Sequence, residues 1–102
     1  MIACGARWPD GQLRPALEDL LGAGATLAHM EEPLLSPEAQ TAAAAFRALQ
    51  GDLPDVLRTC ASGRELILKG FADDVDLAAD LDASASAPVL QGGAYIAADE
   101  RR

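Results

Sequence analysis

Ser62, Gly63 and Arg64 stand together in the second half of the chain, where they could bind an anion at the start of a helix. The free backbone N–H groups of a helix N-terminus attract negative charge, and a hydroxyl and a guanidinium would add directed donors. Ser62 and Glu65 also have the spacing of a capping box, in which each side chain accepts a hydrogen bond from a backbone N–H of the first turn. The pattern therefore allows two interpretations, an anion site or an ordinary helix start with a surface charge.

Two adjacent carboxylates, Glu18 and Asp19, could contribute to a Mg²⁺ site, because Mg²⁺ prefers one or two carboxylates together with water and substrate phosphate. Neighbouring residues of a helix diverge by about 100°, so one helix cannot aim both carboxylates into one pocket. The alternative is a solvated helix face on which Arg14 and Glu18 form a pair worth about 0.3 kcal/mol. We therefore expect one of the two, at most, to point into a metal site.

The loop from Arg7 to Gly11 carries an arginine and an acid, Asp10, close to a short apolar strand that residues 1–5 predict. α/β proteins place ligands beyond the carboxyl ends of their strands. Arg7 could hold a phosphate there, and Asp10 a metal. An ordinary strand-to-helix turn would explain the same residues equally well.

Nucleophilic catalysis has no support among the remaining residues. His29 is the only histidine, and the chain has no GxSxG, Walker or CxxC motif. Cys4 and Cys60 are too few for a disulfide framework, so we expect two buried free thiols. Aspartates recur at helical spacing from Asp73 to Asp80, which is most simply the solvated face of a helix with Asp73 as its N-cap.

The elements that would position these residues are mostly short helices. Leucines from Leu13 to Leu21 have helical spacing, with Pro15 tolerated in the first turn. Ser36 followed by Pro37 is a strong signal for a helix start. The Gly-Gly pair at 92–93 lies between two apolar runs and predicts a β-hairpin. The predicted elements are a strand over residues 1–5, helices that begin near 13, 37, 52, 62 and 73, and hairpin strands over 88–91 and 94–96.

Composition and charge argue against several classes of partner. The net charge is −8, which opposes binding to nucleic acid or to an anionic membrane. No apolar run approaches the ~20 residues that cross a bilayer, and no secretory leader opens the chain, so we expect a cytoplasmic location. Hydrophobic residues make up 50% of the chain but aromatic residues only 4%, which indicates a thin core that leans on another surface.

Four segments of the chain, taken in order, resemble the C-terminal half of the 2-phosphosulfolactate phosphatases: IACGARWPDGQLRPALEDLLGAGA, ASGREL, GFADDVDLAADLD and PVLQGGAYI. The resemblance covers nearly the whole chain and implies a single C-terminal-half domain over residues 1–102. It implies an α/β fold class, namely a helix-rich fragment of a layered α/β phosphatase fold with few short strands and a C-terminal β-hairpin. Members of that family are Mg²⁺-dependent enzymes that hydrolyse 2-phospho-3-sulfolactate to 3-sulfolactate and phosphate, a step towards coenzyme M.

The resemblance also implies a site for a small phosphorylated sulfonate or carboxylate and for its metal ion. The substrate-binding residues would be Arg7, Ser62, Gly63 and Arg64. The residues that hold Mg²⁺ would be Asp10, Glu18 and Asp19. Asp74 matches a further acid of the family.

One position departs from the family pattern, because Gly5-Ala6-Arg7 stands where the family has Gly-Glu-Arg. The missing carboxylate at Ala6 could be a metal ligand or an acid–base group. The family's N-terminal half, with its strand rich in Asp and Arg, has no match in this chain either. The alternative function is therefore a non-catalytic, truncated homologue that forms a homodimer or binds an N-terminal-half partner.

Overall fold

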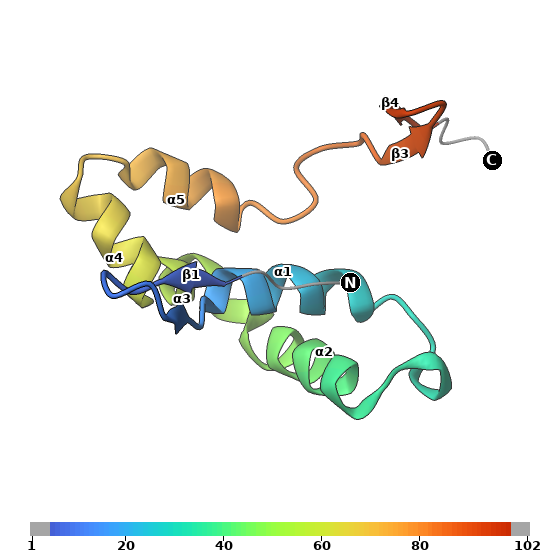
Figure 1. The fold of residues 1–102 in the computed structure, drawn as a ribbon, viewed down its shortest axis with the longest axis horizontal. Helices are drawn as coiled ribbons and strands as arrows, with labels where there is room; N and C mark the ends of the chain where they lie inside the picture. Colours follow the sequence, from blue (N-terminus) through green and yellow to red (C-terminus); the bar gives the residue numbers. More distant parts are fainter. Residues whose placement is uncertain (1–4, 99–102) are drawn as a thin grey trace.

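The structure, a computed structural model, describes residues 5–98 as a set of short helices with two small strand pairs (Figure 1). None of the described helices, the longest of which has 13 residues, is long and apolar enough to cross a membrane. The predicted strand over residues 1–5, except Gly5, and the thiol of Cys4 lie outside the described residues. The elements are β1 (Ala6–Arg7), β2 (Leu13–Arg14), α1 (Leu17–Leu27), the 3-10 helix η1 (Glu32–Leu34), α2 (Pro37–Leu49), the 3-10 helix η2 (Gln50–Asp52), α3 (Leu53–Thr59), α4 (Ala61–Leu68), α5 (Ala72–Ala79), β3 (Pro88–Gln91) and β4 (Ala94–Ala97).

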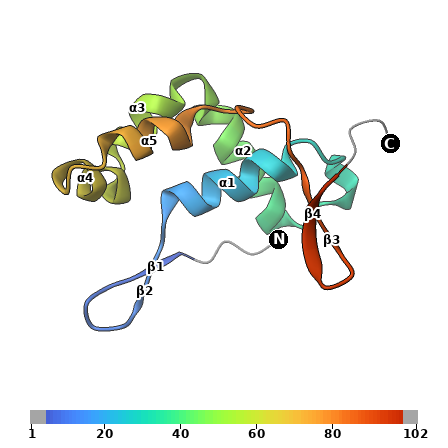
Figure 2. The ribbon, with the colours of Figure 1, turned by 90° about the horizontal axis from the view of Figure 1, so that it is seen from above.

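The predicted fold class, a helix-rich α/β fragment with few short strands, is confirmed. The described strands form two separate antiparallel pairs, β1 with β2 and β3 with β4. The β1–β2 pair extends from the N-terminal end of α1 (Figure 2), whereas β3–β4 follows the last helix at the other end of the chain. The helices between the two pairs therefore form the body of the molecule.

Helices α1 and α2 make a close contact at Gly24. A Cβ at Gly24 would lie 2.1 Å from the carbonyl oxygen of Ala42. Because Gly24 has no side chain, the two backbones come close enough to bury the alanines of α2. Ala42 and Ala43 are accordingly among the buried residues. A close approach of this kind suits helices that carry few large side chains.

The hydrophobic core lies where α1 and α2 meet α3 and α5. Each of these four helices contributes at least one buried residue, and a ring of half-buried alanines, leucines and other aliphatic residues surrounds them. The core is small, as the composition predicts. Its buried members are Leu21, Phe46, Leu53, Leu57, Val75 and Ala79.

Local signals predict the ends of two helices correctly. The Ser36 side chain accepts a hydrogen bond from the Ala39 N–H at 3.2 Å, and α2 begins at Pro37, as the sequence predicts. Helix α4 ends just before Gly70, whose φ of +90° is the left-handed conformation that glycine adopts at helix ends.

Two predictions about helix starts are wrong. Leu13 belongs to β2 and is 64% exposed. Arg14, which precedes Pro15, is disfavoured in a helix, so the chain is extended here and pairs with β1 instead. The N-cap residue of α5 is Phe71 and not Asp73, which lies within the first turn. An acidic residue in the first turn, as Asp73 is, is still favoured by the helix dipole. Helix α5 ends at Ala79, so Leu81 lies beyond it and is exposed.

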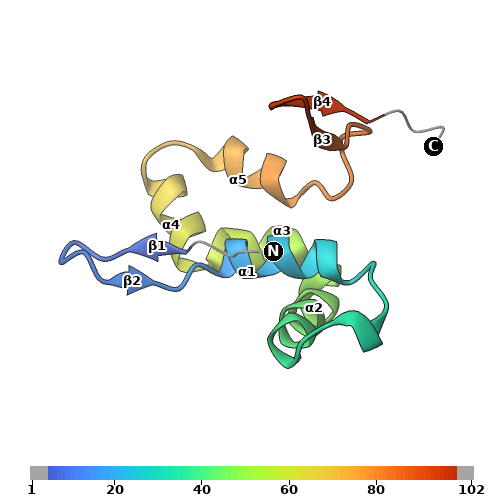
Figure 3. The same ribbon diagram turned by 45° about the vertical axis from the view of Figure 1, so that its right-hand side comes forward.

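The C-terminal hairpin is confirmed in its predicted register. Gln91 pairs with Ala94 across a two-residue turn in which Gly92 and Gly93 both have positive φ, as a type I′ turn requires. All residues of β3 and β4 are exposed, and the hairpin stands clear of the helices in Figures 1 and 3. An isolated two-stranded hairpin is only marginally stable in water, so this element is short of packing partners.

The contact at Gly24 can be tested against a second glycine of the same helix. Gly24→Ala should lower the free energy of unfolding by about 1–3 kcal/mol, because its Cβ would overlap α2. Gly22→Ala should raise it by about 0.5–1 kcal/mol, because nothing lies within 4 Å of the added Cβ and alanine is the better helix former. Urea unfolding measures both. A Gly24→Ala variant as stable as the parent would show that α1 and α2 do not approach this closely.

Candidate functional site

Arg14 ties the β1–β2 pair to helix α4. Its Nη1 donates to Oε1 of Glu65 at 2.6 Å, and its Nη2 donates to Oε2 of Glu65 at 3.2 Å and to Oγ of Ser62 at 3.0 Å. The ring of Trp8 covers the guanidinium, with 5.4 Å between the Arg14 Cζ and the ring centroid. Only 11% of the Arg14 side chain is exposed. Residues about 50 positions apart in the chain therefore meet at one largely buried cation.

The predicted capping box at Ser62 and Glu65 is wrong, because both side chains bind Arg14 instead. The N-cap residue of α4 is Cys60, and Ser62 lies inside the first turn. A hydrogen bond to a guanidinium is roughly twice as strong as one to a neutral amide, so a nearby arginine takes both acceptors. The spacing is that of a cap, but the partners come from a distant strand.

The hydrogen bonds of Arg14 and Glu65 hold both groups in their charged forms. The pKa of the Glu65 carboxyl is lowered chiefly by the hydrogen bond from Arg14, with smaller contributions from the charges of Arg14 and Lys69 and an opposing one from desolvation. The pKa of Arg14 is raised chiefly by the same hydrogen bond, and the nearby charges of Glu65 and Glu18 add to it. The site therefore holds ionised groups at neutral pH.

A small cavity of about 110 Å³ opens beside this ion pair. Glu18 of α1, Ser62 of α4 and Asp74 of α5 line it, together with the half-buried free thiol of Cys60 and apolar residues. The Oε2 atom of Glu18 is buried and has no hydrogen-bond partner within residues 5–98. A buried carboxylate oxygen without a partner is costly, so this atom requires a ligand, a water molecule or a group from another surface.

Gly63, the residue between Ser62 and Arg64, has a packing function. A Cβ there would lie 1.6 Å from the carbonyl oxygen of Leu57, so α4 could not approach α3 with any other residue at this position. Because of this approach, the first turn of α4 reaches the cavity. Gly63 therefore shapes the site by allowing Ser62 to stand next to Glu18.

The formal charges around the cavity favour a cation. Glu18, Glu65 and Asp74 carry three negative charges and Arg14 one positive charge, which leaves an excess of two negative charges. No group of three or more potential metal ligands occurs within residues 5–98. The lining of the cavity itself contains two carboxylates, Glu18 and Asp74, and this number would fit Mg²⁺, which keeps waters and binds substrate phosphate.

Arg7, the last residue of β1, and Asp10, in the turn between β1 and β2, form their hydrogen bonds within this hairpin. Arg7 Nη1 donates to the Gly11 carbonyl at 2.8 Å, and Oδ1 of Asp10 accepts from the Gln12 N–H at 2.9 Å. Both side chains belong to exposed residues. The interpretation of this segment as an ordinary turn accounts for their contacts, although the turn joins two strands and not a strand and a helix.

The other two predicted site residues also lie away from the cavity. Oδ2 of Asp19 accepts from the Gly5 N–H at 2.7 Å and so fastens the start of the described chain to α1. Arg64 lies on the exposed side of α4. Of the predicted residues, the structure brings together Glu18, Ser62 and Gly63, with Asp74, and it places the remaining four elsewhere: Arg7, Asp10, Asp19 and Arg64.

The sequence prediction missed Arg14, which it treated only as a surface partner of Glu18 within a helix. One signal was present, because Arg14 immediately precedes Pro15 and is therefore disfavoured in a helix. An extended Arg14 could reach outward from β2, but its partners on α4 are 48 and 51 residues away in the chain. No local pattern indicates them.

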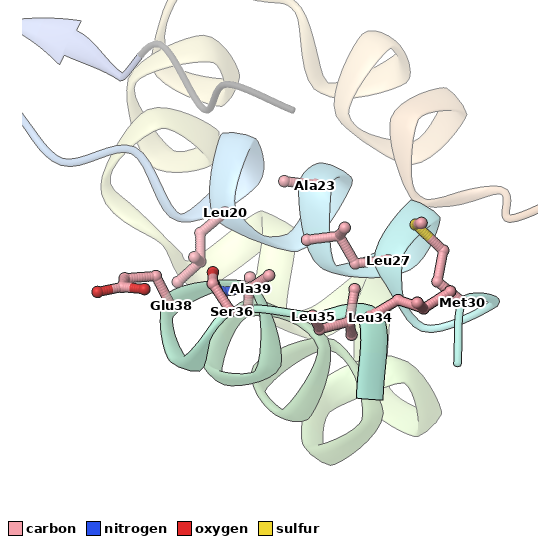
Figure 4. A pocket seen from close by; sticks show the side chains of 10 residues that line it. Leu20, Ala23, Leu27, Met30, Leu34, Leu35, Ser36, Glu38 and Ala39 are labelled. Carbon is pink, nitrogen blue, oxygen red and sulfur yellow. The ribbon is translucent and has the colours of Figure 1, made fainter. Parts of the chain in front are cut away.

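An apolar groove of about 720 Å³ is the second notable feature of the surface (Figure 4). In the figure, Leu27 of α1 lies opposite Leu34 and Leu35. The Leu20 side chain points towards Ser36 at one end of the groove, and Met30 lies at the other end. Leu20 also borders a neighbouring cavity of about 440 Å³ that Leu13 and Leu17 line, so the apolar surface continues along α1. The lining residues are Leu20, Ala23, Leu27, Met30, Leu34, Leu35, Ser36, Glu38, Ala39 and Ala42.

Comparison with known proteins gives one match. The model of the family described as 2-phosphosulpholactate phosphatase matches residues 3–93. No curated protein and no solved structure matches the chain.

Acid should weaken the fold through Glu65. Its folded-state pKa lies below the ordinary value of 4.5, so the stabilisation from the ion pair is fully present above pH 4.5 and is lost as the pH falls through the folded-state pKa. Glu65→Gln cannot titrate and should show a smaller decrease of the unfolding free energy over that range. Urea unfolding at a series of pH values measures the slope, with Glu31→Gln, an exposed residue of a different segment, as control. Equal slopes for Glu65→Gln and the parent would contradict the ion pair.

Proposed function

Because the chain belongs to the 2-phosphosulpholactate phosphatase family, we propose that its site takes part in the Mg²⁺-dependent hydrolysis of a phosphate monoester, 2-phospho-3-sulfolactate, to 3-sulfolactate and phosphate. One observation carries the proposal: Glu18, Ser62 and Asp74, from three different helices, line one cavity next to the Arg14 cation. Carboxylates, a hydroxyl and a guanidinium are the groups that a metal-assisted phosphatase needs.

Glu18 and Asp74 are the residues that would hold Mg²⁺. The bound ion would neutralise the phosphate charge and polarise an attacking water. The unpartnered Oε2 atom of Glu18 supports this assignment, because a bound metal ion would satisfy this oxygen. Ser62 would orient the substrate through its hydroxyl, which already accepts a hydrogen bond from Arg14. Arg64 is exposed on α4 and does not line the cavity, so it would contact substrate only where a second surface closes over that helix.

If Glu18 and Asp74 hold Mg²⁺, substitution of either should weaken Mg²⁺ binding, whereas substitution of the neighbouring Asp73 should not. Glu18→Gln and Asp74→Asn should each weaken Mg²⁺ binding by at least about tenfold, since even indirect ligand contacts are worth about 10- to 100-fold. Asp73→Asn should leave binding unchanged, because Asp73 precedes Asp74 on the same helix but does not line the cavity. Calorimetric titration with Mg²⁺ measures binding, and release of inorganic phosphate from 2-phosphosulfolactate measures turnover.

The turnover assay needs two preparations, because the chain resembles only part of the family's proteins. We expect Mg²⁺-dependent phosphate release from the chain alone or after it is mixed with the N-terminal half of a family member. Absence of phosphate release from both preparations would reject the enzymatic proposal. Equal Mg²⁺ affinity of the parent, Glu18→Gln and Asp74→Asn would reject the metal site on its own.

The exposed apolar surface favours a second candidate function, a non-catalytic homologue that dimerises. The groove along α1 and the bare hairpin leave Leu34 71% and Tyr95 74% exposed. Ala6 lies directly across the strand pair from Arg14, so the carboxylate that family members carry at this position would stand beside the cation of the site. Its replacement by alanine in this chain weakens the case for catalysis by the chain alone and strengthens the case for a binding module.

A matched pair of leucines tests dimerisation through the groove. If a second copy covers the groove, Leu34→Glu should convert the dimer to a monomer, because it places a charge in an apolar contact. Leu68→Glu is the control, because Leu68 is 88% exposed at the end of α4 and does not line the groove. Size-exclusion chromatography with light scattering measures the mass. Moderate salt screens the repulsion between two copies, each of which has a net charge of −8. A cooperative, stable monomer of the parent chain would count against this candidate.

A further inference from the structure

The Glu65 carboxylate binds the Arg14 guanidinium in the way that an anionic ligand would. Its two oxygens accept from Nη1 and Nη2, which is the forked geometry by which arginine binds carboxylates, phosphates and other oxyanions. The two partners differ in burial: the Glu65 side chain is 52% exposed, whereas that of Arg14 is 11% exposed. The carboxylate can therefore turn into water at little cost, but the guanidinium cannot.

The present partners leave Arg14 incompletely satisfied. Its Nε is buried and has no hydrogen-bond partner within residues 5–98. The buried Oε2 of Glu18 also lacks one, and the Glu18 charge acts on Arg14. An unpaired buried donor is destabilising, so an arrangement that places an additional oxygen at Arg14 would be the more stable one.

Glu65 also has a second partner available when it leaves Arg14. Lys69 follows four residues later, near the end of the same helix, and its charge already contributes to the low pKa of Glu65. A glutamate four residues before a lysine is the favourable order for an ion pair on a helix surface. Release from Arg14 would thus not leave the carboxylate without a counter-charge.

We propose that Arg14 is the residue that binds the anionic group of the ligand and that Glu65 occupies this position until the ligand replaces it. The ligand group is a tetrahedral oxyanion, either phosphate or sulfonate, and this choice rests on the proposed function. The carboxylates around Arg14 repel a free anion, so binding strengthens when a divalent cation joins Glu18 and Asp74 or when the charge of Glu65 is removed.

Trp8 makes this inference measurable, because it is the only tryptophan of the chain and lies over the Arg14 guanidinium. The full chain is titrated with inorganic phosphate and, separately, with methanesulfonate, with and without Mg²⁺, while chloride keeps the ionic strength constant. We expect a saturable change of Trp8 fluorescence. The anion that gives the lower Kd identifies which group of the substrate Arg14 binds.

Three variants separate the proposal from a purely structural ion pair. Glu65→Ala and Glu65→Gln should lower the Kd of the anion by about tenfold, because the apparent Kd falls as the competent fraction rises. Arg14→Lys should raise it by about tenfold, because lysine lacks the planar fork. Glu31→Ala, which removes an exposed charge elsewhere, should behave like the parent. Circular dichroism melting confirms that each variant is folded.

Three results would overturn the proposal: an unchanged Kd in both Glu65 variants, an unchanged Kd in Arg14→Lys, or no saturable response in any of the folded proteins. These measurements do not depend on turnover. Tighter binding in the Glu65 variants without phosphate release would retain the anion site and reject the phosphatase. Phosphate release together with an unchanged Kd in Arg14→Lys would retain the phosphatase and reject the anion site at Arg14.

Discussion

Helices with few large side chains bury apolar surface only when their backbones come close together, and this constraint organises the molecule. Two glycines meet it. Gly24 brings α1 onto α2, and Gly63 brings α4 onto α3. Alanines such as Ala43 then become buried, and the few large residues, Phe46 among them, complete a small core. Because a Cβ at either glycine would overlap a backbone carbonyl, these contacts depend on glycine and not on a choice among small residues.

The same close approach creates the candidate site. With α4 pressed against α3, Ser62 faces α1, where Glu18 lies, and the start of α5 adds Asp74. The strand pair then joins this cluster through Arg14, whose hydrogen bonds to Ser62 and Glu65 connect β2 to α4. Packing thus places the carboxylates, and electrostatics places the cation. Both are needed, because the helices alone would gather negative charge without a counter-charge.

The outer surface has a different character from the site. The groove along α1 and the hairpin β3–β4 are apolar, and both are exposed (Figures 1 and 4). Large contiguous apolar patches on a protein surface are typical of contact surfaces. The site and the groove lie on different sides of α1, since Glu18 faces the cavity and Leu20 the groove. A partner could therefore cover the groove without entering the site.

Features that depend on a few neighbouring residues can be read from the sequence alone. Ser36-Pro37 started a helix, Gly70 ended one, Gly92-Gly93 turned the hairpin, and four ordered segments indicated the family that residues 3–93 match. The 100° between neighbours on a helix also separated Glu18 from Asp19 correctly, since only Glu18 lines the cavity.

The composition of the candidate site depends on contacts between distant parts of the chain. Ser62 and Glu65 have the spacing of a cap, but a cation from 48 and 51 residues away takes both side chains. The leucine spacing predicts a helix at Arg14, but Arg14 lies in β2 and binds Ser62 and Glu65. The hydrogen bonds of Arg7 and Asp10 stay within the β1–β2 hairpin. The physical reason is that backbone preferences act between adjacent residues, whereas charged side chains bind the strongest partner that packing brings within reach.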